Sequence, residues 1–456
     1  MARKKIIFGV GAGVVSTGVD GVVGLLNIHY FLHYLPETVA GFWMLSVTAG
    51  GFLMLAQGAI SPAVARFTAQ QIGGSHGQAA AVRLDSIRRL TLQMVGGLLV
   101  SGLLIFLGYL QPVARQNHLG PLAAASWVAY SLGVVCGLDA TSRFAVLNGL
   151  GEVGWDKVTR IATSLAGAVM VWFSLSRGFG LLGLGLVSMV QNLVMLGLAE
   201  YLLHRFGGAA LGGGSKRGSF WRRLFEPWGR VDGASKLSES AERYQLVLET
   251  AKLTGLALIG YVVMNAGIFV IERRFGPELV SKYAPLVRVG TLLCTVASLI
   301  PQTVYPYVAR AWATRNYRSH RRLFLGGVGL AVIGYAVGAL TVWLLAPVLM
   351  PLWLGPGGYL GPKMLGLVLL VFGLLVSNAA FATPVLASIG NAFIGPSLMN
   401  LVLVLLLLWP FSGWWGLNGV PLAMFAGSIL PAIWLACRSW HLMLNHNRLP
   451  SAVHAQ

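Results

Sequence analysis

The sequence predicts an all-α polytopic membrane protein whose twelve transmembrane helices form two six-helix bundles. The first observation is composition: 56% of the 456 residues are hydrophobic and only 10% are charged, whereas a soluble domain is about 25% charged. The second is a series of apolar segments long enough to span a bilayer. The third is an internal repeat that relates the two halves of the chain. Together they exclude a soluble globular protein.

A membrane-spanning helix needs about 20 mostly apolar residues, and twelve segments meet this requirement. The predicted spans are 6–33, 39–65, 90–111, 122–148, 159–176, 179–203, 247–271, 281–309, 324–348, 363–388, 394–412 and 417–437. The first span is longer than the apolar core of a signal peptide, about 7–15 residues, and no small-residue cleavage site follows it. It is therefore predicted to be the first transmembrane helix.

The basic residues predict the orientation of these helices. The net charge of +19 comes from 33 Lys and Arg against 14 Asp and Glu. If the N-terminus is cytoplasmic, 23 basic residues fall in cytoplasmic loops and tails and 6 in outer loops. This bias satisfies the positive-inside rule with both termini in the cytoplasm. The high charge therefore indicates topology, and no nucleic-acid partner is implied.

Three short motifs occur in both halves of the chain, in the same order and at equivalent helix ends. P-E-x-V-x-x-aromatic occurs at 36–42 and 277–283, and P-x-V-A-R at 62–66 and 306–310. V-L, followed three residues later by an aliphatic residue and Gly, occurs at 146–151 and 385–390. Six crossings separate the copies, so they have parallel topology, an arrangement found in alternating-access transporters.

The repeat divides the chain into predicted domains. These are an N-terminal six-helix bundle at 1–203, a basic cytoplasmic linker at 204–246, a C-terminal six-helix bundle at 247–437 and a cytoplasmic tail at 438–456.

The 6+6 arrangement, the P-x-V-A-R motif and the Pro-Glu outer turn resemble the multidrug/oligosaccharidyl-lipid/polysaccharide (MOP) exporter superfamily. Within it, the chain looks most like the Wzx-type flippases. The resemblance implies a V-shaped MATE-like fold that opens alternately to each side of the bacterial inner membrane. It also implies an undecaprenyl-pyrophosphate-linked oligosaccharide as cargo, surface-polysaccharide biosynthesis as the process, and polysaccharide polymerase and glycosyltransferases as partners.

Polar residues within the predicted spans are candidate cargo ligands, because such residues are costly in a membrane. Arg288 begins a polar stripe on the eighth span that continues through Thr291, Thr295, Ser298, Gln302 and Tyr305. A guanidinium offers a planar fork to a pyrophosphate, and sugars need hydroxyl and amide partners. The candidate substrate-binding residues are Arg288, Arg143, Gln302, Asn378, Asn265 and Gln57.

Two acids are candidates for ion coupling, Asp20 and Asp139. Asp139 and Arg143 are spaced i, i+4 with the acid first, which is the favourable order; the pair serves either transport or the packing of the fourth helix on its neighbours. Asp20 lies in the first span, where an acid serves coupling in related multidrug exporters. A simple polar contact between helices is the other interpretation of Asp20.

Three other classes of membrane protein would each require sequence features that differ from those of a flippase. A MATE-type exporter of cationic drugs should present acids to its cavity, whereas Arg143 and Arg288 balance Asp20 and Asp139. A major-facilitator transporter usually carries a G-x-x-x-D-R-x-G-R-R-like turn, which residues 71–77 lack. A membrane glycosyltransferase needs acids or histidines outside the membrane, and only His118 lies in an outer loop.

The expected protein is thus not an enzyme. Its three cysteines, Cys136, Cys294 and Cys437, lie in apolar segments without metal-ligand spacing. We therefore expect no metal and no cofactor.

Overall fold

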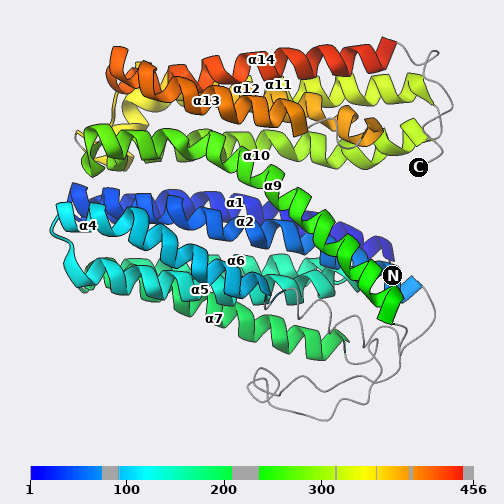
Figure 1. Ribbon diagram of the computed structural model, residues 1–456, viewed down its shortest axis with the longest axis horizontal. Helices are drawn as coiled ribbons and strands as arrows, with labels where there is room; N and C mark the ends of the chain where they lie inside the picture. Colours follow the sequence, from blue (N-terminus) through cyan, green and yellow to red (C-terminus); the bar gives the residue numbers. More distant parts are fainter. Residues whose placement is uncertain are drawn as a thin grey trace. The chain divides into compact units, whose positions relative to one another are not determined.

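In a computed structural model of the chain, the regular structure is entirely helical over the residues that it describes, 2–73, 91, 93–207, 236–313, 316–355, 357–389 and 394–444. Within these residues, twelve helices are long and apolar enough to cross a membrane. This confirms the predicted all-α, multi-pass architecture. The chain forms two compact units (Figure 1).

Unit 1 comprises Met1–Tyr30 and Ser46–Leu258. It contains most of α1, most of α2 and the first part of α9, and the remainder of each of these helices belongs to unit 2. With their full bounds, its helices are α1 (Ala2–Tyr34), α2 (Glu37–Gly73), the π-helix η1 (Phe106–Leu110), α4 (Gln111–Gln116), α5 (Gly120–Gly149), α6 (Val153–Ser176), α7 (Gly180–Gly207) and α9 (Lys236–Phe275).

The third span, Gln93–Gln116, contains the π-helix η1. The backbone N–H of Gln111 bonds to the carbonyl of Phe106, five residues back. Pro112 follows directly and has no N–H to donate to the preceding turn, so the regular α-helical pattern is interrupted at this point. The span then continues to its end as α4.

The packing of α5 on α7 forms the core of unit 1. The buried residues of this core are Ala140, Phe144, Leu147, Met195, Leu196, Ala199 and Leu202. Gly133 allows the helices to approach closely, since a Cβ there would lie only 3.0 Å from the Met189 backbone. The Ser126 hydroxyl donates to the Leu181 carbonyl across the same interface at 2.7 Å. Small residues and interhelical hydrogen bonds are typical of membrane helix packing.

Unit 2 comprises Phe31–Leu45 and Ile259–Gln456. Besides the end of α9, its helices are α10 (Pro277–Ala313), α11 (Tyr317–Leu354), α12 (Pro362–Ile389), α13 (Ile394–Trp414), the short 3-10 helix η3 (Gly416–Asn418) and α14 (Gly419–Leu444).

Interhelical hydrogen bonds connect α12 to its neighbours within unit 2. The Tyr335 hydroxyl of α11 donates to the Leu369 carbonyl at 2.7 Å. The Ser439 hydroxyl of α14 donates to the Phe381 carbonyl at 2.6 Å. Buried polar groups in lipid must find partners within the protein, and these two groups do so across helices.

The two Pro-Glu turns of the repeat pack against each other within unit 2. The first turn leads into α2 at Glu37 and the second into α10 at Pro277, as the repeat predicts. Gly41 lies directly against the Pro277 carbonyl, with no room for a Cβ. The Lys282 ammonium lies 3.2 Å from the Glu37 carboxylate. Phe42 and Tyr283, the aromatic residues of the two motifs, are both fully buried.

The outward faces of the helices are apolar, as expected for surfaces in contact with lipid. On α11 the most exposed large apolar residues are Leu330, Ile333, Val337, Leu344, Val348 and Leu352. A surface helix of a soluble protein would carry polar residues on this face.

Several helices extend beyond the predicted spans. Helix α2 continues to Gly73 and α10 to Ala313. Residues 208–235 of the predicted linker and 445–456 of the predicted tail lie outside the described residues. The division into bundles at 1–203 and 247–437 stays a prediction. The compact units are bounded differently: Phe31–Leu45 belongs to unit 2, and residues 247–258 belong to unit 1.

Candidate transport site

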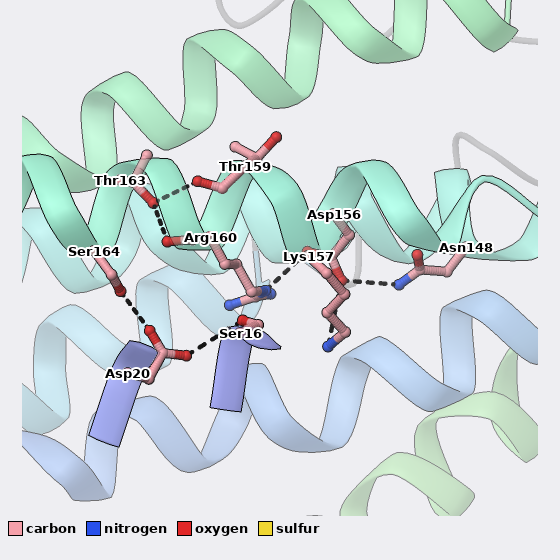
Figure 2. Close-up of polar contacts among 9 residues, drawn as sticks. All are labelled: Ser16, Asp20, Asn148, Asp156, Lys157, Thr159, Arg160, Thr163 and Ser164. Carbon is pink, nitrogen blue, oxygen red and sulfur yellow. Dashed lines mark hydrogen bonds and ion pairs between the residues drawn. The ribbon is translucent and has the colours of Figure 1, made fainter. Parts of the chain in front are cut away.

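Asp20 on α1 is held by hydroxyl groups from two helices (Figure 2). Its Oδ1 accepts a hydrogen bond from Ser164 Oγ of α6 at 2.5 Å, and its Oδ2 accepts one from Ser16 Oγ at 3.5 Å. Near the start of both helices, the ring centroids of Phe8 and Trp155 are 6.3 Å apart. Helices α1 and α6 therefore run parallel, with Asp20 level with Ser164.

A group of charged residues, Asp156, Lys157 and Arg160, precedes Ser164 on α6. Asp156 is buried and accepts from Arg160 Nε at 2.8 Å and from Asn148 Nδ2 at 3.2 Å. Lys157 Nζ lies 3.9 Å from the same carboxylate. The two bases and one acid leave a net positive charge. In Figure 2, Lys157, Arg160 and Ser164 extend to the side of α6 where Ser16 and Asp20 lie.

A second ionic network connects α5 to α7. Arg143 donates to Asp139 Oδ2 from Nε at 3.3 Å and from Nη2 at 3.0 Å. Arg143 Nη1 also pairs with Glu200 Oε2, and Glu200 Oε1 lies 3.0 Å from His204 Nε2. Arg143 thus lies between two carboxylates on different helices. This arrangement supports the interpretation that the Asp139–Arg143 pair contributes to helix packing.

In unit 2, Arg288 is exposed on α10 within the span Pro277–Pro301. Its guanidinium is close enough to the Tyr261 hydroxyl of α9 for an electrostatic interaction. Thr291 and Thr295 follow it on α10, and each hydroxyl donates to the carbonyl four residues back at 2.8 Å. Ser298 is half-buried. The described part of the predicted stripe is therefore accessible and polar.

The four predicted amide ligands differ in their surroundings. Asn265 Nδ2 donates to the Tyr261 carbonyl at 3.0 Å, so Asn265 and Arg288 share Tyr261 as a neighbour. Asn378 is buried, and its Oδ1 has no hydrogen-bond partner among the described residues. Gln57 on α2 and Gln302 on α10 have side chains outside the described part of the structure, as does Tyr305.

The sequence reasoning missed Glu200, His204, Asp156 and Ser164. Glu200 was detectable, because it is an acid inside the sixth predicted span with a histidine at i+4. Asp156 lies just before the predicted start of its span. Ser164 gave no signal, since a single serine in an apolar helix is unremarkable and its partner is 144 residues away. In the described residues, no group of His, Cys, Asp or Glu could hold a metal ion.

Comparison with solved structures identifies proteins that share this fold. No family model and no curated protein matches the chain. Among solved structures, the chain is similar to an inward-facing multidrug resistance MATE family transporter of the MOP superfamily. The TM-score is 0.71 at 14% identity, over 95% of this chain and 96% of that chain.

Two further structures show the same similarity. One is the lipid II flippase MurJ in an inward closed conformation, with a TM-score of 0.70 at 11% identity over 97% of this chain and 91% of that chain. The other is a MATE protein in complex with MaD3S, with a TM-score of 0.64 at 15% identity over 98% of this chain and 97% of that chain. The chain therefore has the twelve-helix fold of MOP-superfamily transporters, as the sequence predicted.

Proposed function

We propose that this protein is a flippase of the Wzx type, located in the bacterial inner membrane with both termini cytoplasmic. It moves an undecaprenyl-pyrophosphate-linked oligosaccharide from the cytoplasmic to the outer leaflet by alternating access. The cargo serves cell-surface polysaccharide synthesis, with a polysaccharide polymerase and glycosyltransferases as partners. The protein makes and breaks no covalent bond and needs no cofactor.

The observation that carries this proposal is the exposed Arg288 at the start of a polar face on α10. An exposed guanidinium inside an apolar span is costly unless it serves a polar cavity or an anionic ligand. Its planar fork suits a pyrophosphate. The hydroxyls of Thr291 and Thr295 on α10 and the amide of Asn265 on α9 are groups of the kind that bind a glycan. The similarity to a lipid II flippase makes a lipid-linked cargo consistent with the fold.

A cation-coupled multidrug exporter of the MATE type is the second candidate. It is favoured by Asp20, whose carboxylate is held by two hydroxyls inside a membrane span. The similarity to MATE transporters is compatible with this alternative to the same degree.

Depletion of the protein distinguishes the two candidates. We expect polyprenyl-linked oligosaccharide to accumulate and surface polysaccharide to fall when expression is switched off. Arg288→Ala should fail to restore the polymer, Arg288→Lys should restore it only in part because the fork is lost, and Arg321→Ala, an exposed arginine of α11, should restore it fully. Unchanged lipid-linked pools together with new sensitivity to cationic drugs would favour the exporter instead.

A further inference from the structure

The α5–α7 network, formed by Asp139, Arg143, Glu200 and His204, ends in a histidine. Arg143 lies between the two carboxylates, bonded to Asp139 Oδ2 at 3.0 Å and paired with Glu200 Oε2. The other oxygen of Glu200, Oε1, lies 3.0 Å from His204 Nε2. With a neutral imidazole, the four groups together carry one negative charge. With an imidazolium they are neutral, and negative and positive groups alternate along the network.

His204 is the member of the network that solvent reaches most easily. Its side chain is 64% exposed, whereas those of Asp139, Glu200 and Arg143 are 31%, 27% and 20% exposed. It lies in the last turn of α7, at the predicted cytoplasmic end of this helix. Histidine is the side chain that ordinarily gains and loses its charge between about pH 5 and pH 8. A proton from the cytoplasm can therefore enter the network at this residue.

Two features of α7 favour a positive charge at His204. Glu200 precedes His204 by four residues, and an acid on the N-terminal side is the favourable order for an ion pair on a helix. The carboxyl end of a helix also carries a partial negative charge. Among the described residues, Glu200 is the only carboxylate that pairs with His204. A proton on His204 therefore converts the contact with Glu200 into an ion pair.

The neighbouring residue Arg205 is a cation that turns away from Glu200. Its Nη1 donates to the Tyr201 hydroxyl at 3.4 Å, and its guanidinium lies 5.6 Å from the centroid of the Phe206 ring. On α5, the remaining titratable group near α7 is the thiol of Cys136, which packs against the α5–α7 core. Arg205 thus opposes a proton on His204 only at longer range.

Helix α6 also packs along α7 and brings further charges to this end of unit 1. Lys157 and Arg160 both pair with Asp156, and no ion pair joins these three residues to the network among the described residues. Glu152, directly before α6, has the same sign as Glu200. The excess cation of α6 therefore reduces the effect of a proton on His204, whereas Glu152 favours it.

We propose that the α5–α7 network is a proton-binding site, at which His204 takes up a proton from the cytoplasm and thereby strengthens the contact between the two helices. The positive charge offsets the repulsion between Asp139 on α5 and Glu200 on α7. The stabilisation is present at acid pH, where the imidazole is protonated, and is lost as the pH rises. The inference is independent of the cargo and of the flippase proposal.

The test compares melting temperatures of the purified full-length protein in detergent at about pH 5.5 and about pH 8. We expect wild-type protein to melt about 1–3 °C above His204→Gln at the lower pH, a small shift because the histidine is largely exposed. The two proteins should melt together at the higher pH. His204→Lys carries its charge at both pH values and should melt above His204→Gln at both.

Two controls identify the partner of the proton. In a Glu200→Gln background, His204→Gln should have no effect at either pH, because the carboxylate that the imidazolium pairs with is gone. His441 is the matched histidine, since it is exposed in the last turn of α14 but follows Cys437, and not an acid, by four residues. His441→Gln should change the melting temperature equally at both pH values.

The same difference between wild type and His204→Gln at both pH values would overturn the inference. A pH-dependent difference that persists in the Glu200→Gln background would overturn it as well, because the proton would then act through another group. Size-exclusion profiles show whether each variant is folded before it is melted. The lipid-linked pools after depletion judge the flippase proposal separately, and neither result decides the other.

Discussion

At the scale of single residues, Gly41 sets the distance between the two Pro-Glu turns. The Pro277 carbonyl occupies the space that a Cβ would need, and backbone atoms cannot move aside as a flexible side chain can. We expect Gly41→Ala to destabilise the protein by about 1–3 kcal/mol, the usual cost of overpacking. Thermal unfolding in detergent measures this effect.

Gly13→Ala is the matched control, because a Cβ at Gly13 meets no atom within 4 Å. Alanine is the better helix former, so the control should be neutral or more stable by up to about 1 kcal/mol. Equal melting temperatures for the two variants would show that the close approach of the turns contributes nothing.

Asp20 is the second residue whose role can be measured. Asp20→Asn keeps the shape of the side chain and removes its charge, so we expect ion-driven transport to be lost in a folded protein. Ser164→Ala removes one hydrogen bond, worth about 1.5–3 kcal/mol when it involves a charged group, and should reduce transport without abolishing it.

Transport by these variants should be measured in proteoliposomes with an imposed pH or sodium gradient. Full activity of Asp20→Asn would show that the contact between Asp20 and Ser164 serves only to pack α1 on α6.

At the scale of helices, the α5–α7 network depends on one cation between two carboxylates. Arg143→Met leaves Asp139 and Glu200 without their shared partner. Glu200→Gln still leaves a neutral Asp139–Arg143 pair. We therefore expect Arg143→Met to lower the free energy of unfolding by about 1–3 kcal/mol more than Glu200→Gln does. The reason is that Arg143→Met leaves two carboxylates without their cation, whereas Glu200→Gln leaves no charge unpaired between Asp139 and Arg143.

The double variant Arg143→Met/Glu200→Gln removes one of the two carboxylates left by the single change. It should recover part of the lost stability in denaturant or thermal unfolding. Additive losses in the double variant would contradict the coupling between the two helices.

The helices themselves could be predicted from the sequence, whereas most helix-to-helix contacts could not. Twelve spans follow from hydropathy, because in a membrane any long apolar segment must satisfy its backbone hydrogen bonds by forming a helix. The i, i+4 pairing of Asp139 with Arg143 is local and was also predicted. The contact of Arg143 with Glu200 requires the rotation of α5 against α7, which depends on the packing of Phe144 and Leu147.

The candidate site was less predictable for the same reason. Asp20 was identified because an acid stands out in an apolar span, but its partner Ser164 was not. Ser164 is one of several serines in apolar helices, and nothing local marks it. Only the register of α1 on α6 shows that Ser164 lies beside Asp20.

At the scale of the whole molecule, the basic residues predict that both termini are cytoplasmic. We expect a cysteine at His118, exposed after α4, to react with a membrane-impermeant maleimide in intact cells. A cysteine at Asn316, exposed at the start of α11, should react only after permeabilisation. The background protein carries Ser in place of Cys136, Cys294 and Cys437. The reverse labelling pattern would invert the topology and the assigned direction of transport.

The segment Phe31–Leu45 has a consequence for how the protein can be built and how it can evolve. This segment lies in the first copy of the repeat but packs with the second, where Ala40 and Leu45 are fully buried. If the gene were divided within the linker, the N-terminal fragment would carry the apolar segment Phe31–Leu45 without the residues that bury it. The C-terminal fragment would lack this part of its hydrophobic core. Neither product is expected to fold by itself, and both should be recovered when they are co-expressed. Each half therefore depends on the other to complete its fold, whether the two are made as one chain or as two fragments.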